Sequence, residues 1–249
     1  MIIRKSREEI AKMREAGRIV AGVLDMLEGH IRPGVKTETL NELAEEYIRE
    51  RNGIPSFLGY RGFPASICTS INEVVVHGIP DRTRLREGDI IGVDVGVVLE
   101  GYQGDAARTY AVGEVSESAR RLMDATAESL RAGIEACRPG KRLGDISNAI
   151  QRTVENEGFS VVVQFVGHGI GKEMHEEPQI PNFGPAGRGS LLEEGMTFAL
   201  EPMVNEGTYE VEVDEGDGWT VRTADGRLSA HFEHTVAITA EGPYVLTLP

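Results

Sequence analysis

Apolar positions divide the chain into segments with helical spacing and shorter segments with strand character. Apolar residues recur every three or four positions in four segments, which predicts helices over 6–28, 37–52, 116–137 and 143–156. Ser6 is followed by Glu9 three positions later, which predicts Ser6 as the N-cap of the first helix. Thr37 is expected to cap the second helix. Shorter apolar runs predict strands at 65–70, 74–76, 90–99, 102–112, 161–166, 196–204, 219–222 and 231–239.

The order of these predicted elements occurs twice. Arg32-Pro33-Gly34 precedes the second helix and Arg138-Pro139-Gly140 precedes the fourth. His77-Gly78-Ile79 has a counterpart in His168-Gly169-Ile170, and segments with acidic residues follow both. Short matches of this kind arise by chance, but the shared order of elements favours an internal duplication. A duplication predicts two pseudo-symmetric halves with a site on the axis between them.

Composition and charge limit the class of protein. The chain has 249 residues, of which 40% are hydrophobic and 27% charged, and it can bury a substantial core. We predict a single domain over 1–249, with the repeat divided into about 1–115 and 116–249. The net charge of −14 argues against a nucleic-acid-binding surface, which is normally basic. Two distant cysteines and the lack of an apolar signal-peptide core or membrane-spanning run indicate a cytoplasmic protein.

Five potential metal ligands are spread over the C-terminal two thirds of the chain. They are Asp94, Asp105, His168, Glu201 and Glu233, each in an apolar or glycine-rich run. Two like charges about 4 Å apart repel by about 1 kcal/mol in water and by about 4 kcal/mol at an effective dielectric constant of about 20. Four carboxylates in one pocket would therefore bind cations or take up protons. Two divalent metal ions that share bridging carboxylates are the expected solution.

Asp94 and Asp105 lie on the two strands of a predicted hairpin. The segment 90–110 turns at Glu100-Gly101, and a two-residue turn there makes Asp94 face Ala107. Asp105 is then the diagonal neighbour of Asp94 on the same face, within about 7–8 Å. The alternative is one turn aspartate and one capping aspartate. An unpaired carboxylate inside a run of valine and isoleucine is costly, which favours the metal site.

Histidines and two further glutamates complete the candidate chemistry. His77, His168 and His175 lie beside glycine or near the ends of predicted strands, and the glycine-rich segment 167–171 is expected to form a loop. A single histidine is more often an ordinary core or surface residue. Glu201 and Glu233 could likewise be charges at strand edges if each is considered alone. The combination makes the site the better interpretation.

This ordered set of residues resembles the methionine aminopeptidases over essentially the whole chain. His77 lies in Val-His-Gly-Ile-Pro, and His168 and His175 lie in a segment that runs from His-Gly-Ile-Gly to His-Glu-Glu-Pro. The related Xaa-Pro peptidases and creatinases usually carry an additional N-terminal domain. Only 31 residues separate Glu201 from Glu233, so the resemblance is to the short bacterial type I form rather than type II. It implies an α+β fold, the pita-bread (creatinase/aminopeptidase) fold, with two pseudo-symmetric helix-plus-antiparallel-sheet halves.

The resemblance also implies how the five ligands share two divalent metal ions. Asp94 would chelate one metal, and His168 with Glu201 would hold the other. Asp105 and Glu233 would bridge both. The identity of the metals (Co, Mn, Fe, Ni or Zn) stays open, because a carboxylate-rich site with one imidazole accepts each of them.

Catalytic and substrate-binding residues follow from the same resemblance. Glu201 would accept a proton from the attacking water, and His175 would bond the carbonyl oxygen. His77 would contact the scissile amide or help the amine leave. An apolar methionine pocket would be formed by Tyr60, Phe63, Cys68 and Trp219, with Phe57 and Met174 nearby. A monovalent cation would lie near Asn72 and Ser229.

The implied function is hydrolytic removal of the initiator methionine from nascent proteins whose second residue is small. Such an enzyme would act as a cytoplasmic monomer on polypeptide N-termini, in transient contact with the ribosome and without binding nucleic acid or membrane. Two alternatives remain open at this point. One is an Xaa-Pro aminopeptidase or dipeptidase with the same metals, and the other is an adaptor that binds peptide or ribosome without cleavage.

Overall fold

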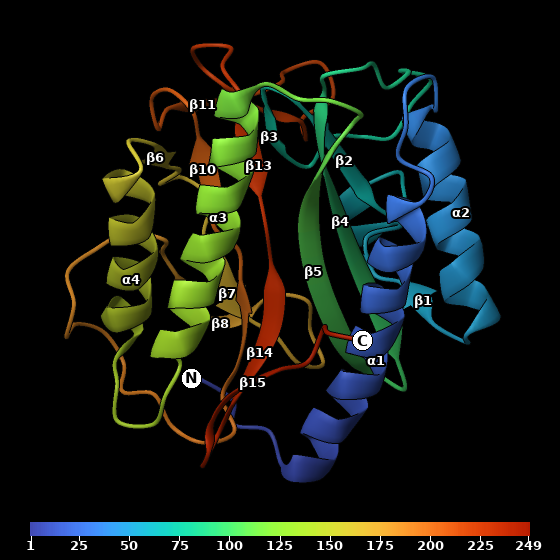
Figure 1. The fold of residues 1–249 in the computed structure, drawn as a ribbon. Coiled ribbons are helices and arrows are strands. Elements are labelled where there is room, and N and C mark those ends of the chain that lie inside the picture. Colours follow the sequence, from blue (N-terminus) through green and yellow to red (C-terminus); the bar gives the residue numbers. More distant parts are fainter.

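The computed structural model describes residues 1–249 and places four long helices outside a set of mainly short strands (Figure 1). The helices are α1 (Arg7–Glu28), α2 (Thr37–Glu50), α3 (Glu117–Ala136) and α4 (Leu143–Asn156), with a 3-10 turn η1 (Tyr60–Gly62). The strands of the first half are β1 (Ile54–Pro55), β2 (Cys68–Ile71), β3 (Val74–Val76), β4 (Ile90–Leu99) and β5 (Tyr102–Ala111). The remaining strands are β6 (Ser160–Val161), β7 (Gly167–Gly169), β8 (Glu176–Ile180), β9 (Thr197–Leu200), β10 (Met203–Asn205), β11 (Val211–Val213), β12 (Val221–Thr223), β13 (Ser229–His231), β14 (His234–Thr239) and β15 (Gly242–Val245).

All four predicted helices are confirmed, but only one of the two predicted caps is. Ser6 and Glu9 form the expected capping box at the start of α1, where each side chain accepts a hydrogen bond from the other's backbone N–H. Thr37 does not cap α2, because Lys36 occupies the N-cap position. The Thr37 hydroxyl instead accepts a hydrogen bond from the backbone N–H of Asp81 at 2.8 Å. This long-range contact cannot be read from local sequence.

Four sheets carry the strands. β1, β4 and β2 lie side by side with β5 paired to β4, and helix α1 packs against β4 and β5 (Figure 1). In the second half β15, β14, β9, β7 and β8 form a five-stranded sheet, and α3 packs against α4. Two three-stranded sheets, β13-β10-β6 and β11-β12-β3, complete the fold. None of the helices combines the length and the apolar character needed to cross a membrane.

The β4–β5 hairpin has the predicted register. Asp94 is paired with Ala107, and Asp105 is paired with Gly96, so the two aspartates are diagonal neighbours. Glu100 and Gly101 both have positive φ values, of 49° and 79°. Two such residues in a two-residue turn match the twist of the hairpin strands and fix this register.

Two predicted strands are interrupted, and a predicted loop is a strand. The segment 196–204 divides into β9 and β10 at Glu201-Pro202, and the segment 231–239 divides into β13 and β14 at Phe232-Glu233. Pro202 has no N–H to donate to a strand ladder, which accounts for the first break. The segment 161–166 is mostly not strand, and glycine-rich 167–169 forms β7 rather than a loop. The two breaks leave the predicted metal ligands Glu201 and Glu233 outside the paired strands.

Two threonines join the halves of the molecule by matching sets of hydrogen bonds. The Thr235 hydroxyl accepts from the backbone N–H of Asp105 at 3.0 Å and donates to its carbonyl at 2.8 Å. The Thr109 hydroxyl does the same for His231, at 2.9 and 2.8 Å. Each half thus supplies one threonine that holds the backbone of the other half.

Between the threonines, Ala107 and Glu233 exchange two backbone hydrogen bonds, of 2.9 and 3.3 Å. Part of β5 (105–109) therefore runs antiparallel to residues 231–235. We call these two segments the central seam. It places residues of the two halves beside one another at the middle of the fold.

The pseudo-symmetry extends to the loops before α2 and α4. Gly34 donates its backbone N–H to Leu85 at 2.7 Å, and Gly140 donates to Leu192 in the same way at 3.1 Å. Together with the paired helices and antiparallel sheets, these contacts confirm the predicted α+β class with two pseudo-symmetric halves. The division at 115/116 stays a prediction.

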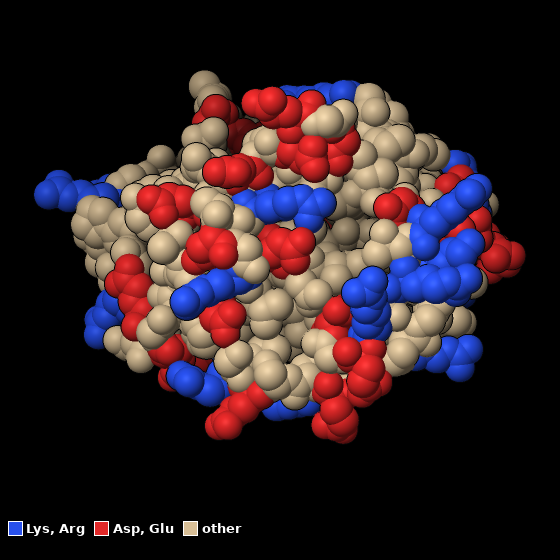
Figure 2. All heavy atoms as spheres, turned by 90° about the horizontal axis from the view of Figure 1, so that it is seen from above, with Lys and Arg blue, Asp and Glu red and all other residues tan.

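Charged side chains of both signs are mixed on the surface. On the face drawn in Figure 2, Asp and Glu side chains are interspersed with Lys and Arg, and several basic side chains lie together at the right of the view. The full chain has 40 acidic and 26 basic residues.

The seam makes the Thr235 hydroxyl a testable stabilising group. Thr235 is fully buried, and Thr235→Val would leave the N–H and carbonyl of Asp105 without their partner. We expect the free energy of unfolding to fall by about 1–3 kcal/mol, measured by urea denaturation of metal-free protein. Thr153→Val, which removes a hydroxyl bonded only within its own helix, serves as the control. Equal losses in both variants would contradict a special role of the seam.

Candidate active site

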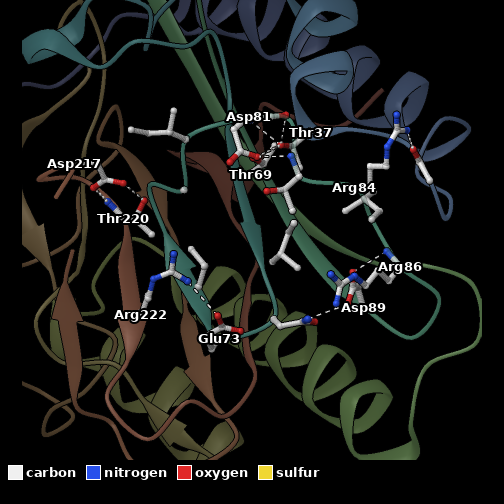
Figure 3. A pocket seen from close by; sticks show the side chains of 18 residues that line it. Thr37, Thr69, Glu73, Asp81, Arg84, Arg86, Asp89, Asp217, Thr220 and Arg222 are labelled. Atoms are coloured by element: carbon white, nitrogen blue, oxygen red, sulfur yellow. Dashed lines mark hydrogen bonds and ion pairs between the residues drawn. The ribbon is translucent and has the colours of Figure 1, made fainter. Parts of the chain in front are cut away.

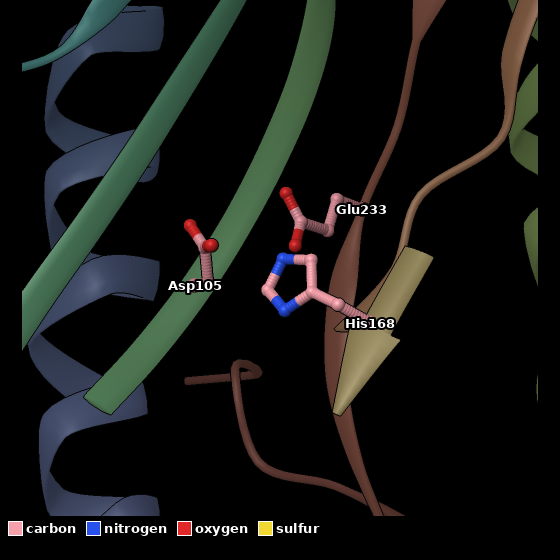
Figure 4. A group of neighbouring side chains, drawn as sticks. All are labelled: Asp105, His168 and Glu233. Carbon is pink, nitrogen blue, oxygen red and sulfur yellow. The ribbon is translucent and has the colours of Figure 1, made fainter. Parts of the chain in front are cut away.

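All five predicted ligands line a single cavity of about 160 Å³. Asp94 and Asp105 come from the hairpin β4–β5, His168 comes from β7, and Glu201 and Glu233 come from the two strand breaks. In Figure 4 the side chains of Asp105, His168 and Glu233 point toward one another. Each of these three offers a ligand atom within 4.8 Å of the others. The five residues therefore converge on one cavity, and their roles as metal ligands stay a prediction.

Three carboxylate oxygens in the cavity are buried without any hydrogen-bond partner. They are Asp94 Oδ1, Asp105 Oδ1 and Glu233 Oε1. Buried polar atoms in native proteins are nearly always partnered, so orphaned atoms in one cluster need an explanation. Carboxylate oxygens that converge without donors are suited to bind cations. The donor set of four carboxylates and one imidazole fits divalent metal ions.

The carboxyl groups are also electrostatically strained. Burial raises the pKa of Asp94 to about 7. Burial, followed by the negative charges of neighbouring carboxylates, raises the pKa of Asp105, Glu201 and Glu233 well above the usual range. Without cations, the cavity therefore favours protonated carboxyls.

His168 has the tautomer that a metal ligand requires. Its Nδ1 lies 2.9 Å from the carbonyl oxygen of Gly169, which can only accept, so Nδ1 carries the hydrogen. The unprotonated Nε2 faces the cavity, 3.4 Å from Glu201 Oε1. Burial lowers the pKa of His168 to about 4, which keeps the ring neutral. A fixed Nδ1–H bond and a free Nε2 are typical of metal-binding histidines.

His175 and His77 approach the cavity from other directions. Nδ1 of His175 lies 2.8 Å from the Tyr60 hydroxyl, and its ring centroid lies 4.3 Å from that of His168. His77 has a φ of 60° and makes edge contacts with Phe165 and Trp219. Burial lowers the pKa of His77 to about 4, so this ring is neutral too. Both residues line the cavity, as the sequence predicted.

An apolar wall closes one side of the cavity. Phe63 and Cys68 are buried, and the Phe63 ring meets Trp219 edge to face with centroids 5.2 Å apart. Tyr60 also lines the cavity, as do Phe57 and Met174. Burial, and then the charge of Asp94, raises the pKa of the Cys68 thiol well above its usual value. A thiol that stays protonated is a pocket-lining group and not a nucleophile.

Sequence reasoning missed two residues at this site. Arg61 lines the mouth of the cavity with a φ of 48°. His231 is buried on the central seam, and its Nε2 lies 3.8 Å from Glu201 Oε2. The position of His231 two residues before Glu233 in a predicted strand is a signal that could have identified it, because alternate strand residues share a face.

Asn72 and Ser229, where a monovalent cation is predicted, are neighbours. The Ser229 N–H donates to the backbone carbonyl of Asn72 at 2.8 Å. The Asn72 amide donates to Asp89 at 2.9 Å, and the Ser229 hydroxyl donates to Asn205 at 2.9 Å. The polar groups here are largely paired, and cation binding at this position stays a prediction.

A larger groove of about 1,000 Å³ lies outside the cavity and differs from it chemically (Figure 3). Its acidic side chains all have partners in the protein. Asp81 bonds Thr37 and Thr83, Asp89 bonds Asn72 and the Arg86 N–H, Asp217 bonds Thr220, and Glu73 bonds Arg222. No buried carboxylate is orphaned in this groove. The reactive cluster is confined to the smaller cavity.

Comparison with known proteins agrees with this geometry. Residues 11–240 match the metallopeptidase family M24. The chain is 58% identical to a methionine aminopeptidase of Clostridium acetobutylicum, covering all of this chain and 99% of that protein. It is 52% identical to methionine aminopeptidase 1 of Bacillus subtilis, covering 99% of both chains.

Solved structures show the same relationship. The crystal structure of methionine aminopeptidase from Rickettsia prowazekii superposes with a TM-score of 0.98 and 47% identity, covering all of both chains. A prolidase from Pyrococcus furiosus superposes with a TM-score of 0.78 at 22% identity, covering 99% of this chain and 66% of that one, which shows a shared fold. The chain therefore belongs to metallopeptidase family M24, the metal-dependent hydrolases of the pita-bread fold, and within it to the methionine aminopeptidases that its sequence resembles.

Proposed function

We propose that this protein removes N-terminal methionine from polypeptides whose second residue is small, with two divalent metal ions in its cavity. The observation that carries the proposal is that four carboxylates and one imidazole line one cavity, and that three of the carboxylate oxygens there are buried without a hydrogen-bond partner. The names of its close relatives support the substrate. Action as a cytoplasmic monomer on nascent chains, with transient ribosome contact, belongs to the same proposal.

The ligands divide naturally between two cations. Asp94 would hold one, His168 and Glu201 would hold the other, and Asp105 and Glu233 would contribute to both. When bound, divalent cations supply Lewis acidity, which lowers the pKa of water and polarises a carbonyl group. The donor set suits Co, Mn, Fe, Ni or Zn.

Three side chains of the protein handle protons and charge in the proposed reaction. Glu201 would accept the proton of the attacking water, because its carboxylate lines the cavity where that water would lie. Nδ1 of His175 is paired with the Tyr60 hydroxyl at 2.8 Å, and the other ring nitrogen, Nε2, would bond the substrate carbonyl oxygen as negative charge develops. His77, neutral and at the cavity wall, contacts the scissile amide.

The cavity also suits the proposed substrate. Its volume of about 160 Å³ is below the roughly 300–1,000 Å³ of pockets for drug-sized ligands, so it accommodates one residue rather than several. Phe63, Cys68 and Trp219 offer an apolar, polarisable surface for a thioether side chain. An Xaa-Pro peptidase has the same ligand order, but the apolar wall favours methionine.

The first prediction concerns cleavage and its specificity. We expect metal-dependent release of methionine from Met-Ala-Ser but not from Met-Leu-Ser, measured as free methionine with added Mn, Co or Fe. Asp105→Ala should lower the rate of methionine release by more than about 100-fold. Loss of a residue that only orients a metal ligand costs about 10–100-fold in activity, and loss of a ligand itself should cost more. Asp89→Asn, in the outer groove, is the matched control and should retain activity.

Other outcomes would select the alternatives. Cleavage of a peptide with proline second and a first residue other than methionine, without cleavage of Met-Ala-Ser, would identify an Xaa-Pro peptidase. Metal binding without cleavage of any peptide would favour the adaptor.

The second prediction concerns His175. We expect His175→Ala to lower kcat about 100- to 1,000-fold, as the loss of a donor to a developing oxyanion does. Metal affinity, measured by calorimetry, should stay unchanged because His175 is not among the proposed ligands. His30→Ala, at the exposed end of α1, is the control. A variant that loses metal instead of rate would show that His175 is a ligand.

The third prediction concerns the stability of metal-free protein. The pKa of Asp94 is about 7 in the folded protein against an ordinary value of 3.8, so the folded state binds more protons between these values. The contribution of Asp94 to the free energy of unfolding is then fully present below about pH 4 and is lost as the pH rises through about 7. We expect the Tm in EDTA to fall between pH 5 and 8, and to fall less in Asp94→Asn. Added metal should abolish the decrease, and a Tm that rises over this range would contradict the assignment.

A further inference from the structure

We propose that His231 is a positioning residue that holds the Glu201 carboxylate by a hydrogen bond. The inference rests on the proposed function, in which Glu201 is both ligand and proton acceptor. The His231 side chain is 5% exposed, and its Nε2 is buried without any hydrogen-bond partner. The same atom faces Glu201 Oε2 at 3.8 Å.

The backbone of His231 cannot move away from this position easily. Its N–H and carbonyl are both held by the Thr109 hydroxyl on the central seam. The hydrogen bonds that join the two halves therefore also position the His231 imidazole beside Glu201. A buried donor fixed in this way is costly unless it finds an acceptor, and Glu201 Oε2 is the acceptor that it faces.

The two oxygens of Glu201 have different neighbours. Oε1 lies 3.4 Å from Nε2 of His168, which has no hydrogen on that atom. Oε2 lies beside His231 Nε2, which can carry one. With its hydrogen on Nε2, the His231 ring can donate to Oε2. Oε1 then stays on the side of His168, where it can act as a ligand.

The contact closes by a small shift. A nitrogen–oxygen hydrogen bond spans about 2.7–3.2 Å, so the 3.8 Å separation must shorten by about 0.6–1.1 Å. Hydrogen bonds at active sites are often long before ligands bind and shorten in the complex. The backbone carbonyl of Glu201 is held by the Asn182 amide at 3.0 Å, which leaves the side chain as the adjustable part.

The experiment compares His231→Leu, which fills space without donating, with His231→Gln, whose amide can still donate. We expect His231→Leu to lower kcat for Met-Ala-Ser by about 10- to 100-fold with KM within about twofold, the range for outer partners of metal ligands. The affinity for Mn, measured by calorimetry on stripped protein, should fall in the same range. His231→Gln should retain both quantities within about threefold. His30→Leu is the control, since His30 is exposed beyond the end of α1 and its ring hydrogen-bonds only the Met26 carbonyl.

Each outcome decides the inference. Unchanged kcat and Mn affinity in His231→Leu, or an equal loss in His231→Gln, would overturn it in favour of packing alone. If the wild type binds Mn but cleaves no peptide, the proposed function fails, and the Mn affinities of the two variants still test the positioning of Glu201. If His231→Leu does not fold, His231→Asn replaces it, because its amide is too short to reach Oε2.

Discussion

The site depends on the central seam, where β5 lies against residues 231–235. Thr235 holds Asp105 and Thr109 holds His231, so each half fixes a functional residue of the other. Glu233 lies between them through its backbone bonds to Ala107. Neither half contains a complete ligand set, and the site exists only where the two meet. The threonine hydroxyls supply hydrogen bonds that an interrupted strand ladder no longer provides.

Burial and mutual repulsion of the cavity carboxylates destabilise the folded state when no cation is bound. Orphaned oxygens and raised pKa values at Asp94, Asp105 and Glu233 show that the carboxylates are held together by the scaffold and not by mutual attraction. Cations would relieve the repulsion and satisfy the oxygens at once. Functional sites often concentrate such locally unfavourable arrangements, which the remainder of the protein stabilises.

Much of this arrangement could be predicted from the sequence, for identifiable reasons. The period-2 pattern and the Glu100-Gly101 turn determine the hairpin register, and the ordered ligands identify the family. The strand breaks, the hydroxyl contact of Thr37 and the role inferred for His231 depend on partners far away in sequence. Such contacts leave no local pattern, which is why the expected cap and the two unbroken strands were wrong.

The seam also bears on the order of folding. Its threonine contacts join residues 130 and 122 positions apart, so they close long loops and are expected to form after the local hairpins and helix pairs. The ligands from the second half thus reach Asp94 and Asp105 only when each half already has a core. The four carboxylates therefore come together late in folding, when the packed cores of the two halves can offset the repulsion between them.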